Sequence, residues 1–127
     1  AATDFEEYRE VNELILQGRK LASDILIAQA KDSTTYDTVV ISKAADAMLA
    51  MSGIEASFVL AKNTQGFISI SARSRSKINV QRIMEELGGG GHFNLAAAQI
   101  ENMSLSEAGE KLTKLILDEL KEKEKEE

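Results

Sequence analysis

The sequence of 127 residues contains no cysteine, no proline and no tryptophan, and it has only one histidine. Without cysteine, neither a disulfide framework nor a thiolate metal site can form. Without proline, the chain has no proline kink and no cis-proline turn. A single histidine leaves no His/Cys metal constellation, so we expect this chain to bind no metal or other cofactor itself. No run approaches the ~18 apolar residues of a membrane span, and no signal-peptide pattern is present.

The bulk composition indicates one folded domain. Hydrophobic residues make up 43% of the sequence and the net charge is −6. This length is sufficient for a single core, and the acidic balance argues against binding to extended nucleic acid. The chain starts Ala1-Ala2 without an initiator methionine, which suggests an excised fragment whose neighbouring domains are missing.

Basic residues gather in one window of the sequence. No acidic residue lies between Ala56 and Met84. The basic residues of this window are Lys62, Arg73, Arg75, Lys77 and Arg82. A purely solvating surface usually mixes both signs of charge. We therefore favour a site for a small anionic ligand over a solvated charged face.

Hydrophobic periodicity predicts an alternation of helices and strands. The predicted helices cover residues 4–20, 37–51, 79–87, 94–98 and 104 onward, and the predicted strands cover 25–28, 57–61, 67–72 and 98–103. Alternating Lys and Glu over 121–127 predict a frayed, solvated tail. In the strand over 67–72, alternation places Ser69, Ser71 and Arg73 on one face. The order of elements indicates an α/β fold, in which a mixed sheet of about four to five strands is flanked by helices in a single compact domain over residues 1–127.

The most unusual segment is a run of four glycines, Gly88, Gly89, Gly90 and Gly91, followed by His92. Residues without a Cβ let another molecule approach the backbone closely. The apolar flanks, Leu87 and Phe93, are unlike those of a flexible linker, so we favour a ligand-binding loop. Neither a Walker A loop nor a G-x-G-x-x-G fingerprint is present, because no Gly-Lys-Ser/Thr follows and the sixth position from the first glycine is Phe93.

These residues together predict an anion site. The amides of Gly89, Gly90 and Gly91 would form a nest of N–H donors, to which the predicted helix over 94–98 would add its positive end. Arg73 can bind a phosphate through two parallel hydrogen bonds, and Ser74 can donate another. His92 would donate to phosphate or lie against a base; the alternative is a structural histidine packed beside Phe93.

Three segments carry a resemblance to a known family: residues 70–74 (Ile-Ser-Ala-Arg-Ser), 83–92 (Ile-Met-Glu-Glu-Leu-Gly-Gly-Gly-Gly-His) and 96–99 (Ala-Ala-Ala-Gln). They resemble the DHH-associated domain of the DHH phosphoesterase superfamily. The likeness is greatest to the membrane-bound bacterial cyclic di-AMP phosphodiesterases. Gln99 stands where nanoRNA phosphodiesterases and RecJ-type exonucleases tend to have glycine.

The resemblance implies a substrate-binding domain with ligand positions at Arg73, Ser74, Gly88 to Gly91 and His92. In this family a separate Asp-His-His domain holds two manganese ions and hydrolyses cyclic di-AMP to 5′-pApA. This sequence has no Asp-His-His segment, so we expect manganese in a missing domain of the same polypeptide. We expect this chain to hold no catalytic residue and to be inactive alone, on the cytoplasmic side of a membrane-anchored protein.

Several alternatives stay open at this point. The domain could serve a nanoRNA or pApA phosphodiesterase, or a RecJ-type single-strand exonuclease. A non-catalytic nucleic-acid module, similar to the C-terminal domain of alanyl-tRNA synthetases, is disfavoured by the net charge. The expected partners are a cyclic or short linear dinucleotide and the DHH domain, and a homodimer formed through the helix over 4–20 is a further alternative.

Overall fold

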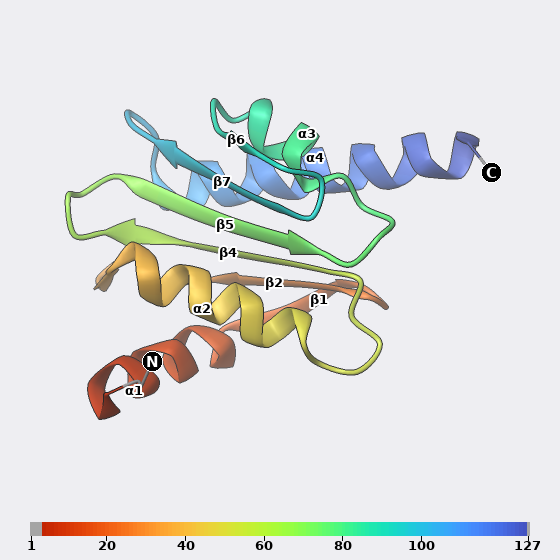
Figure 1. Cartoon of the computed structure of the whole chain (residues 1–127). Coiled ribbons are helices and arrows are strands. Elements are labelled where there is room, and N and C mark those ends of the chain that lie inside the picture. Colours follow the sequence, from red (N-terminus) through yellow and green to blue (C-terminus); the bar gives the residue numbers. More distant parts are fainter. Residues whose placement is uncertain (1–3, 127) are drawn as a thin grey trace.

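A mixed β-sheet separates two layers of helices in the computed structural model, which describes residues 4–126 (Figure 1). In chain order the elements are α1 (Phe5–Leu16), β1 (Gly18–Ala22), β2 (Ile25–Gln29), β3 (Thr35–Tyr36), α2 (Thr38–Leu49), β4 (Ala56–Asn63), β5 (Ile68–Ser74), α3 (Val80–Glu85), β6 (Gly90–Gly91), β7 (Leu95–Ile100) and α4 (Leu105–Glu126). The strand order is β1-β2-β4-β5-β7-β6, with β3 paired to β4 beyond the end of β2. β4 runs parallel to β2 and β3, and the other pairs are antiparallel.

Each face of the sheet is covered by its own helices. α1 and α2 pack on one face and form a core with the side chains of Val59 and Ala61. α3 and α4 pack on the other face, where they meet Phe58, Leu60 and Ile70. The strand residues alternate between the two cores because successive side chains of a strand point to opposite faces. β4 and β5 are therefore buried on both sides.

The α/β fold with a mixed sheet is confirmed, but the described residues form seven strands rather than four or five. The helix predicted over 94–98 is wrong, because these residues lie in β7. Alanine favours helix, yet without β7 the outer edge of β5 would leave its N–H and C=O groups unpaired. The predicted helix over 4–20 is too long, since α1 ends at Leu16 and Gly18 begins the exposed edge strand β1.

The C-terminal tail also differs from the expectation. Residues 121–126 continue α4, and Glu127 lies outside the described residues, as do residues 1–3. Lys and Glu are good helix formers, and ion pairs three or four residues apart support the exposed helix, as between Lys125 and Glu122 (3.5 Å). Within residues 4–126, no helix combines the length and the apolar character needed to cross a membrane.

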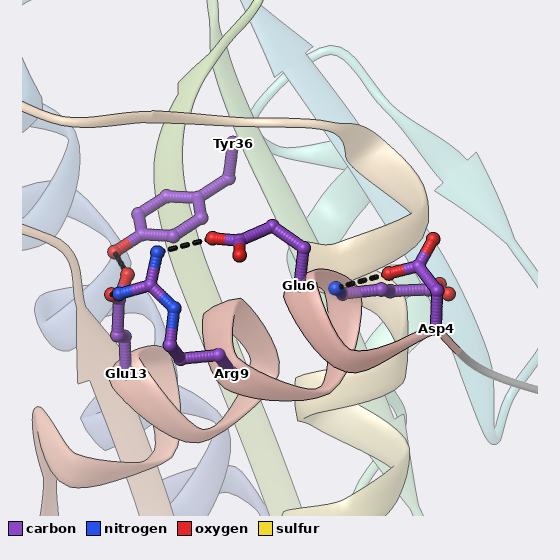
Figure 2. A network of polar contacts seen from close by, with 6 residues as sticks. Asp4, Glu6, Arg9, Glu13 and Tyr36 are labelled. Atoms are coloured by element: carbon purple, nitrogen blue, oxygen red, sulfur yellow. Dashed lines mark hydrogen bonds and ion pairs between the residues drawn. The ribbon is translucent and has the colours of Figure 1, made fainter.

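Helix α1 is fixed to the domain by apolar contacts and by polar contacts, some of which Figure 2 shows. Leu14 is fully buried in the core under α2. The Tyr36 hydroxyl donates a hydrogen bond to the Glu13 carboxylate at 3.0 Å, and Lys43 pairs with Glu7 at 2.7 Å. Burial of the phenol, followed by its hydrogen bond to Glu13, raises the pKa of Tyr36 to about 12. The Asp4 carboxylate caps the start of the helix by accepting from the Glu7 N–H at 2.7 Å.

Candidate functional site

The register of β5, β7 and β6 brings the predicted site residues to one end of the sheet. Arg73 of β5 lies opposite Leu95 of β7. The N–H of Leu95 in turn donates to the carbonyl of His92, and the N–H of His92 donates back, at 3.3 and 2.8 Å. With neighbouring strands ~4.8 Å apart, the backbones of Arg73 and His92 are about 10 Å apart across β7. Leu95 lies between them and is 52% exposed.

Arg73 is held in a fixed position. Only 7% of the residue is exposed, and its Nε donates to the Asp46 carboxylate of α2 at 2.7 Å, while Nη1 donates to the Ala72 carbonyl at 3.0 Å. Within residues 4–126, Nη2 makes no hydrogen bond, yet no fully buried side-chain nitrogen lacks a partner. Nη2 therefore keeps its contact with solvent. The guanidinium presents one free edge to an incoming anion.

Ser74 has a different environment from the one expected. Its hydroxyl is buried, donates to the Ile78 carbonyl at 2.6 Å and lies 3.3 Å from the carbonyl oxygen of Phe93. Asn94 adds hydrogen bonds from its side-chain amide to the carbonyls of Ser74 and Arg75, at 3.2 and 2.7 Å. These contacts fasten the β6–β7 hairpin to the loop that follows β5. Ser74 thereby fixes the hairpin that carries His92.

Two requirements of the fold, a positive φ and a close approach to β7, account for three of the four glycines. Gly88 has a φ of +83°, and the N–H groups of Gly88 and Gly89 donate to the carbonyls of Glu85 and Met84, which is the Schellman ending of a helix. Gly89 and Gly91 lie directly against β7: a Cβ would come within 2.1 Å of the Ala97 carbonyl oxygen at Gly89, and within 2.5 Å of the Leu95 carbonyl oxygen at Gly91.

Gly90 meets neither requirement. Its φ is not positive, and a Cβ built there would have no heavy atom within 4 Å. It pairs with Ala97, which pairs in turn with Ser71, on the side of the sheet that α2 leaves open beyond β5 (Figure 1). No contact inside the described chain explains a glycine at this position.

The donors of the loop differ from the predicted nest of three amides. The Gly89 N–H already donates to Met84. Hydrogen-bonded and non-hydrogen-bonded pairs alternate along an antiparallel ladder. Because His92 and Leu95 form a hydrogen-bonded pair, Gly91 and Ala96 form a non-hydrogen-bonded pair, and Gly90 and Ala97 form the next hydrogen-bonded pair. The N–H of Gly91 is therefore directed away from β7. β7, not a helix, follows the loop, so no helix dipole adds to the site. One amide, that of Gly91, remains for a ligand.

His92 and Phe93 form the tip of the hairpin. The His92 side chain is exposed and makes no hydrogen bond within residues 4–126, and Phe93 is 40% exposed. The backbone of His92 is nevertheless fixed by its two hydrogen bonds with Leu95. The imidazole is therefore available to solvent from a rigid position, as a ligand contact requires.

A small cavity of about 230 Å³ lies over Ser69 and Ser71, which share a face of β5 with Arg73. It is lined by Thr38 and Ser42 of α2, by Ser69, Ile70 and Ser71 of β5, and by Gly89, Ala97, Ala98 and Gln99. Sequence reasoning placed Ser69 and Ser71 on the face of Arg73 but missed the contributions of Asp46, Ser42 and Gln99. In β7, exposed residues (Leu95, Ala97 and Gln99) alternate with buried ones, as in a strand with one covered face. The run of alanines hid this alternation, because alanine favours helix.

The acidic residues and the single histidine do not assemble a metal centre. Across residues 4–126, no three carboxylate or imidazole groups come together in a way that could hold a metal ion. The donor groups of the described residues therefore do not fit a manganese site.

Comparison with known proteins places most of the chain in one family model. The model described as the DHHA1 domain matches residues 22–122. The cyclic-di-AMP phosphodiesterase GdpP of Geobacillus thermodenitrificans is 46% identical over 94 residues, which cover 74% of this chain and 14% of that protein. The cyclic-di-AMP phosphodiesterase PdeA of Listeria monocytogenes is 46% identical over 90 residues, with 71% and 14% covered. The chain spans about one seventh of the length of these relatives.

A solved structure shares the fold. The crystal structure of an exopolyphosphatase-related protein from Bacteroides fragilis superimposes with a TM-score of 0.78 at 17% identity. The match covers 92% of this chain and 36% of that chain. At this identity the likeness concerns the fold alone.

Proposed function

Because the chain belongs to the DHHA1 domain family, we propose that it is the substrate-binding domain of a cyclic di-AMP phosphodiesterase. Two relatives that are cyclic-di-AMP phosphodiesterases support this substrate, as does the motif resemblance of residues 70–74 and 83–92. In this proposal the whole enzyme hydrolyses one phosphodiester of cyclic di-AMP and releases 5′-pApA. The catalytic residues and manganese belong to a DHH domain elsewhere in a membrane-anchored polypeptide, with this domain on the cytoplasmic side.

The observation that carries the proposal is the immobilised Arg73 guanidinium with its free Nη2 edge. Asp46 and the Ala72 carbonyl hold Nε and Nη1, so little side-chain entropy is lost when a phosphate binds the remaining edge. A phosphate there would form charge-assisted hydrogen bonds, which are about twice as strong as neutral ones. In this reading the carboxylate of Asp46, whose side chain is 61% exposed, orients Arg73 for the ligand.

The glycine loop and His92 form the opposite side of the same surface. We assign the Gly91 N–H and the His92 imidazole to ligand contact, because this N–H is directed away from β7 and the His92 side chain is exposed. Gly90 gives the ligand room to approach the sheet, since any side chain would fill the open space above it. Gly88, Gly89 and Ser74 shape and fasten the hairpin.

The proposal is tested by titrating the chain, labelled with ¹⁵N, with cyclic di-AMP and with 5′-pApA. We expect the amide signals of Arg73 and of residues 90–92 to shift. Arg73→Ala should weaken binding of both ligands at least tenfold, in line with the loss of a charge-assisted bond of about 1.5–3 kcal/mol. His92→Ala should weaken binding as well.

A matched control is Arg19→Ala, which removes an exposed arginine from the edge strand β1 and should leave binding unchanged. In a full-length phosphodiesterase carrying this domain, Arg73→Ala and His92→Ala should lower turnover of cyclic di-AMP while the bound manganese stays constant. The proposal fails if both variants bind and turn over the dinucleotide like the unmodified protein.

A further inference from the structure

We propose that the cavity over Ser69 and Ser71 is a subsite for a nucleobase and that Gln99 donates a hydrogen bond to this base. This inference rests on the proposed function, because Arg73 would hold the phosphate of the nucleotide whose base enters the cavity. It adds a base-recognition cavity to a surface for which the motifs indicated phosphate contacts and, as one alternative for His92, a contact with a base.

The lining of the cavity has the chemistry of a neutral ring. All nine lining residues are uncharged, and they combine hydroxyl and amide groups with small apolar side chains. A phosphate would lose its hydration there without gaining an opposite charge, which is costly. A nucleobase is neutral, flat and edged with hydrogen-bonding groups. The volume of about 230 Å³ lies below the ~300–1,000 Å³ of pockets that enclose drug-sized ligands, so it suits one ring system and not a whole dinucleotide.

The orientation of Gln99 follows from a chain of hydrogen bonds. The Asn63 Oδ1 accepts from the backbone N–H groups of Gln65 (2.9 Å) and Phe67 (3.2 Å), so its Nδ2 must face the other way. That Nδ2 donates to the Ser69 hydroxyl at 2.8 Å and to the Gln99 Oε1 at 3.4 Å. The Gln99 Oε1 is therefore turned toward Asn63, and its Nε2 is left as a donor.

The hydroxyls of the cavity floor add to the same pattern. Ser69 accepts from Asn63, so its own O–H proton remains available. Ser71 and Ser42 lie 3.2 Å apart and share one hydrogen bond, which leaves one of their two protons available. The floor is thus rich in donors. It matches the ring-nitrogen acceptors on the edges of a base such as adenine.

The spacing along β5 connects the two halves of the surface. Ser71 and Arg73 are two residues apart on one face of the strand, a separation of about 7 Å. Ser71 lines the cavity and Arg73 does not, so the guanidinium lies next along the same face of β5, outside the cavity. Ala97 and Gly90 continue the row from Ser71 across the sheet with little side-chain bulk, so that a ring can lie flat over them.

The test compares two simple ligands that differ only in the base: adenosine 5′-monophosphate and ribose 5-phosphate. Affinities are measured by NMR titration of the unmodified chain, of Gln99→Ala and of Ala97→Val. Both altered residues are exposed on β7, and valine favours strands, so the fold should persist. Gln65→Ala, at the exposed turn between β4 and β5, is the matched control for the loss of a glutamine side chain.

We expect the unmodified chain to bind adenosine 5′-monophosphate more tightly than ribose 5-phosphate. Gln99→Ala should reduce that advantage about 3- to 10-fold, as expected for one neutral hydrogen bond, and Ala97→Val should abolish it by filling the cavity. Neither change should alter ribose 5-phosphate binding, whereas Arg73→Ala should weaken both ligands.

Equal affinities of the two ligands for the unmodified chain, or an advantage unaffected by both β7 variants, would overturn the base subsite and leave the phosphate site standing. If neither ligand nor cyclic di-AMP binds, the proposed function itself is wrong, and the base subsite is rejected with it.

Discussion

At the scale of single residues, the four glycines of the run have different structural roles. Gly88 supplies a positive φ where α3 ends, and Gly89 and Gly91 allow the chain to lie against the backbone of β7. Of the four, Gly90 alone combines open space around its Cα with a φ that is not positive. Under the proposed function, a requirement of the ligand accounts for the missing side chain at position 90.

Gly89→Ala and Gly90→Ala separate these two requirements. At position 89 the new Cβ would lie 2.1 Å from a backbone carbonyl oxygen, so we expect the free energy of unfolding to fall by more than about 2 kcal/mol. At position 90 we expect a change within about 0.5 kcal/mol together with weaker binding of cyclic di-AMP. Urea denaturation and ligand titration measure the two effects. Equal losses of stability in both variants would contradict the assignment.

At the scale of elements, the polar contacts of α1 decide how this helix joins the domain. Tyr36 is the last residue of β3, and its hydroxyl donates to Glu13 of α1 (Figure 2). The phenol is buried beside a carboxylate, and both conditions oppose its ionisation, which is the reason for its raised pKa. The contact between β3 and α1 is therefore sensitive to alkaline pH.

The pKa of Tyr36 is about 12 in the folded protein against 10.0 for an unperturbed tyrosine. Between these values the unfolded chain loses the phenolic proton while the folded protein keeps it, so stability falls as the pH rises. The contribution of the neutral Tyr36 phenol to the stability of the fold is complete below pH 10 and is lost as the pH rises through 12. We expect Tyr36→Phe to lose about 1 kcal/mol of stability at pH 7, since the bond to Glu13 is removed.

Between pH 10 and about pH 12, Tyr36→Phe should lose less stability than the unmodified protein. Urea denaturation at a series of pH values measures both curves. Tyr8→Phe is the matched control, because the Tyr8 side chain is 63% exposed on α1 and should leave the pH dependence unaltered. Identical alkaline curves for Tyr36→Phe and the unmodified protein would refute the role of this contact.

At the scale of the whole molecule, the folded unit extends beyond the residues of the family model. The matched region begins at residue 22, whereas the buried Leu14 belongs to α1. Leu14 completes the core between α1, α2 and β4, on the face of the sheet that also carries Asp46. The stability of the ligand surface should therefore depend on a helix outside the matched residues.

Leu14→Ala tests this dependence. Removal of a fully buried leucine side chain typically costs 2–5 kcal/mol, and we expect thermal and urea unfolding to shift accordingly as one transition. Leu16→Ala is the control, because Leu16 lies on the same helix and is 83% exposed. A stability of Leu14→Ala equal to that of Leu16→Ala would show that α1 is dispensable to the domain.

Local patterns in the sequence predicted a large part of this molecule. Helical periodicity located α2, α3 and α4, short apolar runs located β2 and β4, and alternation located β5, because each pattern records how its element is buried. The same alternation placed Ser69, Ser71 and Arg73 on one face. The glycine run and the basic window predicted a ligand surface near residues 73 and 88–92, and this prediction of ligand contact stays open to the experiments above.

Tertiary structure decided what depends on residues distant in the chain. β7 is a strand because it pairs with β5, although its alanines favour a helix. Three of the expected donors are already occupied by hydrogen bonds inside the fold: Arg73 Nε donates to Asp46, the Ser74 hydroxyl to the Ile78 carbonyl and the Gly89 N–H to the Met84 carbonyl. None of these pairings follows from spacing in the sequence. Sequence determined which groups could meet an anion, since side-chain chemistry is local. Packing determined which of those groups remain unpaired, since hydrogen-bond partners are chosen across the whole fold.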